Sequence, residues 1–182
     1  MKLVNIWRHF KTITRHKLLV MKSCFQVGLI RQGLLHDLSK YSWTEFKSGV
    51  KYYQGTRSPN AAEREEKGFS EAWLHHKGRN KHHYEYWTDL GPNKEKGFVG
   101  VKMPLKYVAE MVIDRIAASK VYKKENYTNS SALEYYEMTK RYIIIHPETR
   151  KLLYKLLKML SVKGEDYTFA YIRRVLLKKG TY

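Results

Sequence analysis

An apolar repeat that begins after Pro104 constrains the fold of this chain more than any other feature. Its members recur at intervals of three and four residues: Leu105, Val108, Ala109, Val112, Ile113, Ile116, Ala117 and Val121. This spacing places them along one face of a helix, and a proline just ahead of such a repeat is typical of a first helical turn. The sequence therefore predicts a core helix here, with Asp114 inside its apolar stripe.

The segment before this repeat is also predicted to be helical. Apolar residues recur at helical intervals over residues 4–33, with Gly28 and Gly33 as expected breaks. The motif Ser42-Trp43-Thr44-Glu45 is a capping box, which predicts a helix that ends at Tyr52 or Tyr53.

Helices are expected in most of the remaining chain as well. One should span Ala61 to about His76, whereas residues 94–103 are expected to form a loop or a short hairpin. Three helix starts are predicted further on, at a second capping box (residues 131–134), at Pro147 and at Asp166, with the last helix ending near Gly180.

The length of 182 residues and the lack of a polar linker predict one domain. We predict a single all-α domain over residues 1–182, with about six to eight helices and a basic helical portion from about residue 130. The formal net charge is +18, and residues 1–36 contain seven Lys or Arg but no acid. Such a field favours anionic partners, nucleic acid among them. The alternative is that the basic side chains are simply solvated.

Two absences limit the class of protein. Cys24 is the single cysteine, so an internal disulfide is excluded, and no run of about 18 apolar residues predicts a membrane span. We therefore expect a soluble cytoplasmic protein without a membrane partner.

Histidines are clustered in two short segments. His36 precedes Asp37 among apolar residues, and four more lie in the stretch from Leu74 to His83, at His75, His76, His82 and His83. Imidazoles and carboxylates are costly to bury unless they are paired, and a divalent metal is an efficient partner. Adjacent side chains on a regular helix point about 100° apart, so His36 and Asp37 require a helix end or bend to share one ion.

The order of these residues resembles the HD-domain metal-dependent phosphohydrolases, all-α proteins with a first His, a His-Asp pair and a distant Asp. The matching positions are His16, His36-Asp37 and Asp114, and both His36 to Lys40 and Asp114-Arg115 fit the family's motifs. More narrowly, HDLSK, AWLHHKGRNKHHYEYW, MPLKYVAEMVIDR and HPETR are similar to an uncharacterised HD-like family of bacteria and their phages. This likeness covers most of residues 10–155 and brings no established substrate.

The resemblance implies a primary metal site and a second ion or substrate site. The primary ligands are His16, His36, Asp37 and Asp114, with Asp37 as a candidate bridge. The candidates for the second site are His76, His82 and His83, with His75 less favoured; adjacent histidines seldom both point inward, so one of His82 and His83 is expected to orient the site or face substrate. One or two divalent transition-metal ions fit such ligands, namely Mn, Fe, Zn, Co or Ni.

The activity implied by the resemblance is hydrolysis of a phosphate ester by metal-activated water. The expected substrate is an anionic phosphate-containing small molecule such as a nucleotide, with its phosphate held by Lys40, Arg79 and Arg115. Three alternatives remain: a di-iron oxygenase on the same scaffold, a basic all-α nucleic-acid-binding protein without catalysis, and a degenerate domain that only binds a ligand. His9 and His146 are predicted to be structural, with His146 at a helix entry.

Overall fold

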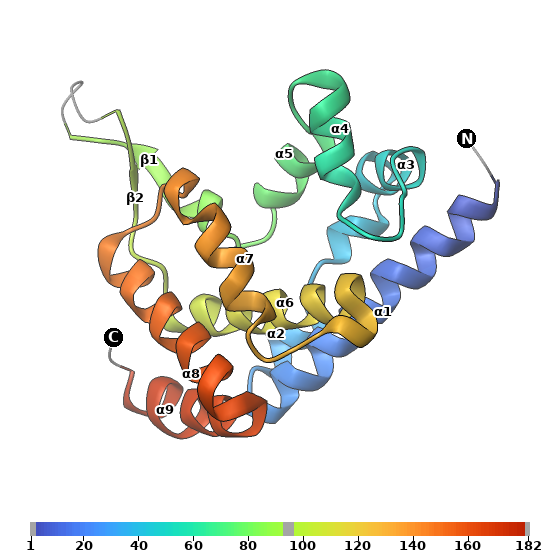
Figure 1. Cartoon of the computed structure of the whole chain (residues 1–182). Helices are drawn as coiled ribbons and strands as arrows, with labels where there is room; N and C mark the ends of the chain where they lie inside the picture. The colour runs from blue at the N-terminus through green and yellow to red at the C-terminus, as the bar shows by residue number, and fades with distance from the viewer. Residues whose placement is uncertain (1–2, 93–96, 181–182) are drawn as a thin grey trace.

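The computed structural model describes residues 3–92 and 97–180, and helices dominate it (Figure 1). This confirms the predicted all-α class. The helices are α1 (Leu3–Val27), α2 (Ile30–Leu35), α3 (Trp43–Lys51), α4 (Pro59–Lys67), α5 (Glu71–Lys77), α6 (Leu105–Lys123), α7 (Ser131–Thr139), α8 (Pro147–Tyr171) and α9 (Leu177–Lys179). Among these residues, no helix combines the length and the apolar character that a membrane span needs.

Two short strands lie between α5 and α6. Strands β1 (Thr88–Leu90) and β2 (Phe98–Gly100) pair antiparallel, with Thr88 opposite Gly100. The region predicted as a loop or hairpin thus supplies one strand of a hairpin, and its residues 94–96 lie outside the described part, as do residues 1, 2, 181 and 182 of the predicted domain.

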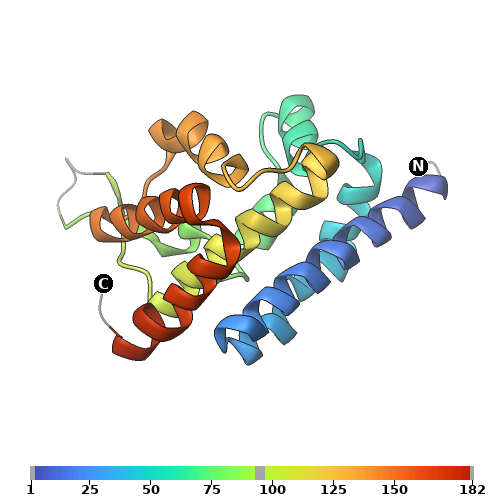
Figure 2. The ribbon, with the colours of Figure 1, turned by 60° about the horizontal axis from the view of Figure 1, so that its bottom comes forward.

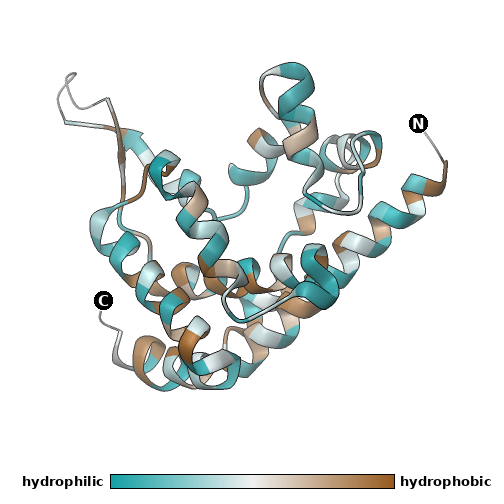
Figure 3. Ribbon diagram, in the orientation of Figure 1, coloured by the Kyte–Doolittle hydropathy of each residue, from teal (hydrophilic) through white to brown (hydrophobic). Residues whose placement is uncertain are grey.

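Helix α6 lies at the centre of the fold, between α1 and the C-terminal helices (Figure 2). Its apolar residues are buried on more than the predicted stripe, because Val108 and Ile113 face different neighbours and Met111 is buried as well. Leu156 and Leu160 of α8 and a π-helical turn at Ile172–Leu176 complete the core. Apolar residues therefore concentrate along these central helices, whereas α4 is mostly hydrophilic (Figure 3).

Two predicted helix boundaries were wrong for reasons of packing and backbone geometry. Gly28 ends α1 with a φ of +86°, as predicted, but Gly33 lies inside α2. A Cβ at Gly33 would lie 3.0 Å from the Cβ of Cys24, so this glycine permits close helix packing. The predicted helix from Ala61 to His76 is divided at Gly68, and the Ser70 hydroxyl begins α5 by accepting from the Trp73 backbone N–H.

The predicted helix caps have mixed outcomes. Helix α3 begins at Trp43 as expected, but the Ser42 side chain makes no cap, and Glu45 bonds histidines instead. Helix α7 begins one residue after its N-cap, Ser130, so the second capping box is also wrong. Asp166 lies inside α8 rather than at a helix start; the kink there is at Gly164. His146 does cap α8, because its Nδ1 accepts the Glu148 N–H at 3.3 Å.

Candidate metal centre

A sharp change of backbone direction separates His36 from Asp37. Helix α2 ends at Leu35, His36 is extended (ψ 127°), and Asp37 adopts left-handed φ and ψ of 53° and 26° before a 3₁₀ turn. Aspartate is one of the few residues that tolerate this conformation. The bend removes the 100° separation of a regular helix and turns both side chains toward α6, while Lys17 Nζ donates to the His36 carbonyl at 3.0 Å.

The four primary candidates converge from three helical regions. His16 comes from α1, the His36-Asp37 pair from the end of α2, and Asp114 from α6. His16 Nε2 lies 2.9 Å from Asp114 Oδ1, 3.4 Å from His36 Nε2 and 3.6 Å from Asp37 Oδ2. His36 Nε2 lies 3.3 Å from the same Asp37 oxygen. Ligands about 2.1 Å from one tetrahedral ion are roughly 3.4 Å apart, so these atoms already have the spacing of a coordination shell.

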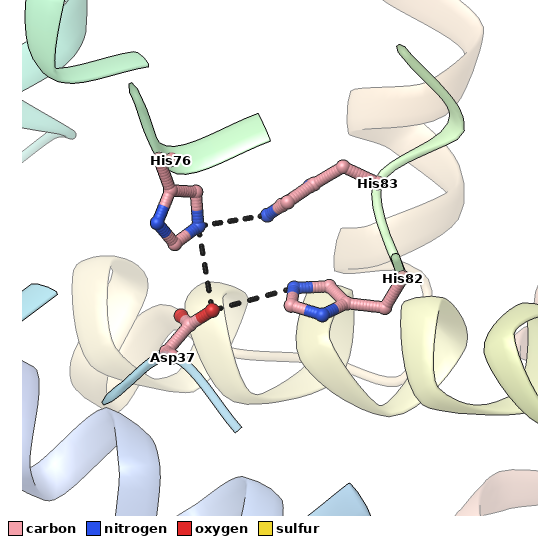
Figure 4. Close-up of side chains that lie close together, drawn as sticks. All are labelled: Asp37, His76, His82 and His83. Atoms are coloured by element: carbon pink, nitrogen blue, oxygen red, sulfur yellow. Dashed lines mark hydrogen bonds and ion pairs between the residues drawn. The ribbon is translucent and has the colours of Figure 1, made fainter. Parts of the chain in front are cut away.

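A second group of ligand atoms shares Asp37 with the first. The other Asp37 oxygen, Oδ1, lies 3.3 Å from His76 Nε2 and 3.4 Å from His82 Nε2 (Figure 4). His83 Nε2 lies 2.8 Å from His76 Nε2. The expectation that only one of the adjacent His82 and His83 points inward was wrong, because the non-helical segment after α5 turns both rings toward His76 and Asp37.

Two buried glutamates orient the histidines of both groups. Glu110 Oε1 lies 3.0 Å from His36 Nδ1 and 3.3 Å from His82 Nδ1. Glu45 lies 2.8 Å from His76 Nδ1 and 2.7 Å from His75 Nδ1. A carboxylate at Nδ1 fixes the proton there and leaves Nε2 as the metal-binding nitrogen. His75 therefore contacts Glu45 and lies outside both ligand groups.

The centre is strongly charged although it is buried. Burial by itself would raise the pKa of Asp37, but His36, Lys40 and His76 outweigh it and hold that pKa well below its usual value. Burial likewise opposes the charged form of His36, yet Asp37, Asp114 and Glu110 keep its pKa well above 6.5. The carboxylates thus stay ionised and attract positive charge, which protons on imidazoles or metal ions can supply.

The ligand atoms themselves lack ordinary hydrogen bonds. Among the described atoms, both oxygens of Asp37 and Nε2 of His82 are buried without a hydrogen-bond partner. Lys40 Nζ lies 2.6 Å from Asp37 Oδ2 as an ion pair. Buried polar atoms are rarely left without partners, so these orphaned atoms fit a cation between the two groups.

The three predicted phosphate contacts differ in position. Lys40 is beside Asp37, and the charges of Asp37 and Asp114 raise its pKa although burial opposes this. Arg79 is exposed and donates to the His75 carbonyl at 3.4 Å, away from the ligand atoms. Arg115 is half-buried, and its Nε has no hydrogen bond among the described residues. Only Lys40 contacts a ligand residue.

Several residues of the centre were not identified from the sequence. Glu45 was interpreted as part of a capping box, and Glu110 was overlooked within the apolar repeat. Glu110 lies four residues before Asp114, one turn away on the same face of α6, and that spacing was the available signal. Asn80 donates to Ser39 Oγ at 2.8 Å and closes the second group from below, which no local pattern predicts.

Comparison with known proteins assigns a family but no activity. The model of a family of unknown function, DUF5662, matches residues 5–159. All the residues of both ligand groups and both orienting glutamates fall within this match. No curated protein and no solved structure matches the chain.

Proposed function

We propose that this chain, which belongs to the DUF5662 family of unknown function, is a metal-dependent phosphohydrolase with two ion sites. The observation that carries the proposal is the position of Asp37, which directs one oxygen at each ligand group. A carboxylate shared in this way is typical of two-metal sites that clamp both the attacking and the leaving oxygen of a phosphoryl group. The resemblance of the ligand order to HD-domain proteins points to the same chemistry.

The donor set supports transition metals rather than calcium. Each group combines imidazole nitrogens with carboxylate oxygens, whereas calcium prefers oxygen alone. Mn, Fe, Zn, Co and Ni all accept such ligands. When bound, these ions supply Lewis acidity that activates water and polarises a phosphoryl oxygen.

The remaining residues would prepare the centre for an anionic substrate. Glu110 orients one histidine in each group, so a single side chain keeps the two groups in register. Lys40 carries a positive charge beside Asp37 with 28% of its side chain exposed, which suits it to contact a phosphate oxygen entering from solvent. Its ammonium group acts as a point charge rather than a bidentate fork.

Elemental analysis tests the proposal directly. The purified protein should contain one or two equivalents of a transition metal, and His36→Ala and Asp37→Ala should lose it. Asp166→Ala is a matched control, because Asp166 is exposed on α8 and far from the ligand groups. A wild-type protein that neither carries nor takes up any of the five metals would refute the site.

Activity separates the hydrolase from the oxygenase alternative. The metal-loaded protein should hydrolyse bis(p-nitrophenyl) phosphate or a nucleotide, and Asp37→Ala should reduce this rate by at least about a thousandfold, because the bridging ligand is lost. Oxygen consumption with visible absorbance of an oxo-bridged iron pair, and no phosphoester hydrolysis, would instead identify a di-iron oxygenase.

A further inference from the structure

A groove of about 870 Å³ lies between α1, the segment after α3 and the end of α6. Every charged side chain that lines it is basic: Arg8, Lys11, Arg15, Lys22 and Lys124. None of the acidic residues in the described part of the chain lines this groove. The positive field predicted from composition is therefore concentrated at one concave surface.

The basic residues of α1 form one stripe along that helix. Positions 8, 11, 15 and 22, with Leu18 between them, follow the spacing of three and four residues that aligns side chains on one face. Like charges one turn apart repel each other, and α1 contains no acid to offset them. Lys124 adds backbone strain, since its φ of 51° is unusual for a residue with a side chain. A polyanion in the groove would offset the repulsion.

Polar and aromatic groups accompany the cations. Tyr53 and Gln54 line the groove, and the Tyr53 hydroxyl lies 2.9 Å from the Thr12 hydroxyl. Phe10 also lines it and stacks on Trp7, whose side chain is 59% exposed, with 5.8 Å between ring centroids. Cations beside exposed aromatic rings are typical of surfaces that bind single-stranded nucleic acid, because the rings stack on bases and the cations contact phosphates.

The groove adjoins the candidate metal centre. Val121 lines the groove, and the next residue, Tyr122, is half-buried. Tyr122 interacts electrostatically with Tyr53 on the groove side and with Lys40 and Asp114 on the side of the centre. One tyrosine thus separates the two features.

We propose that this groove binds single-stranded nucleic acid and directs a phosphodiester of the strand to the metal centre. The proposal rests on the proposed hydrolase and names its substrate class. In the reaction, a water oxygen bonds to phosphorus and the bond from phosphorus to one sugar oxygen breaks. The water gives up a proton and the leaving oxygen gains one, which yields one phosphomonoester end and one hydroxyl end. The concave, polar groove favours a strand over a membrane surface, which requires an apolar helix face.

Fluorescence anisotropy with a labelled oligothymidylate of about twenty nucleotides tests the binding. The double variant Lys11→Glu/Lys22→Glu should lose about tenfold or more in affinity, and the slope of log K against log salt should become shallower by about 1.4, at roughly 0.7 for each lost phosphate contact on a single strand. Lys151→Glu/Lys158→Glu on the exposed face of α8 changes the net charge equally and should bind like wild type. Metal content and circular dichroism check that each variant is folded.

Other outcomes overturn the proposal. Equal losses in both double variants would show a general charge effect, and binding to phosphatidylglycerol vesicles but not to the oligonucleotide would show a membrane surface. The wild type's metal-dependent hydrolysis of bis(p-nitrophenyl) phosphate separates the two proposals. If that activity is present but the oligonucleotide is neither bound nor cleaved, the nucleic-acid inference fails and the hydrolase stands; if that activity is absent, the hydrolase fails, and nucleic-acid binding without cleavage overturns the coupling between groove and centre.

Discussion

The candidate metal centre and the packing site of His9 both bury imidazole rings between helices, but only the first surrounds them with carboxylates. In the centre, Glu110 and Glu45 lie within 3.3 Å of Nδ1 on the histidines that they orient. The His9 ring instead packs on Phe46, and its Nδ1 has no hydrogen bond among the described residues.

The two environments shift the imidazole pKa in opposite directions. Burial, aided by the charge of Lys40, lowers the pKa of His9 to about 4, so the ring is neutral at pH 7. In the centre, ionised carboxylates outweigh burial and raise the pKa of His36. A buried histidine therefore indicates a metal site only where acceptors fix one nitrogen and other ligand atoms converge on the second.

Metal binding should give the largest difference between the two regions. A metal present at a thousandfold its dissociation constant should raise the free energy of unfolding by about 4 kcal/mol, because it binds only the folded centre. Urea unfolding with and without a chelator measures this gain. Asp37→Ala should abolish it and Asp166→Ala should keep it; a gain that survives Asp37→Ala would place the ion elsewhere.

The orienting carboxylate should matter less than the ligands. Glu110→Gln keeps the shape of the side chain but removes the charge that fixes Nδ1 of His36 and His82. Metal affinity measured by titration calorimetry should fall about 10- to 100-fold. Glu134→Gln, on an exposed ion pair with Lys123, is the matched control and should leave affinity unchanged. Equal affinities of wild type and Glu110→Gln would exclude the orienting role.

At the His9 site, steric packing rather than coordination should decide stability. A Cβ at Gly49 would lie 2.1 Å from His9 Nε2, so Gly49→Ala should destabilise the fold by about 1–3 kcal/mol through overpacking. His9→Ala opens the space that this methyl group needs. In a double-mutant cycle by urea unfolding, the cost of Gly49→Ala should therefore shrink in the His9→Ala background. Strictly additive costs would show that the contact is not the cause.

The lowered pKa of His9 predicts a pH dependence. Between pH 6.5 and 4 the unfolded chain binds a proton at His9 that the folded chain does not, so stability falls by about 1.4 kcal/mol for each unit of acidification. This contribution is absent above the unfolded pKa. His9→Leu should remove that part of the slope, measured as the difference between urea unfolding of wild type and variant across this range. Parallel pH profiles would contradict it.

Helical regions were predictable because their signals are local. The repeat after Pro104 gives α6, and Pro147 with His146 gives the start of α8, since proline and a capping side chain act within one turn. Boundaries that depend on partners were not predictable. Gly33 stays inside α2 because Cys24 packs against it, and Glu45 forgoes its expected cap to reach histidines on α5.

The sequence by itself determined the all-α class, the family and the residues that can bind a metal, because periodicity and the order of His and Asp are properties of the chain. Only the tertiary structure decided how those residues are grouped. The left-handed turn at Asp37 splits its two oxygens between two sets of histidines, and α6 brings Glu110 beside both. Residues such as His36 and Glu110 are 74 positions apart, so their pairing depends on how α2 packs against α6, which no local pattern encodes.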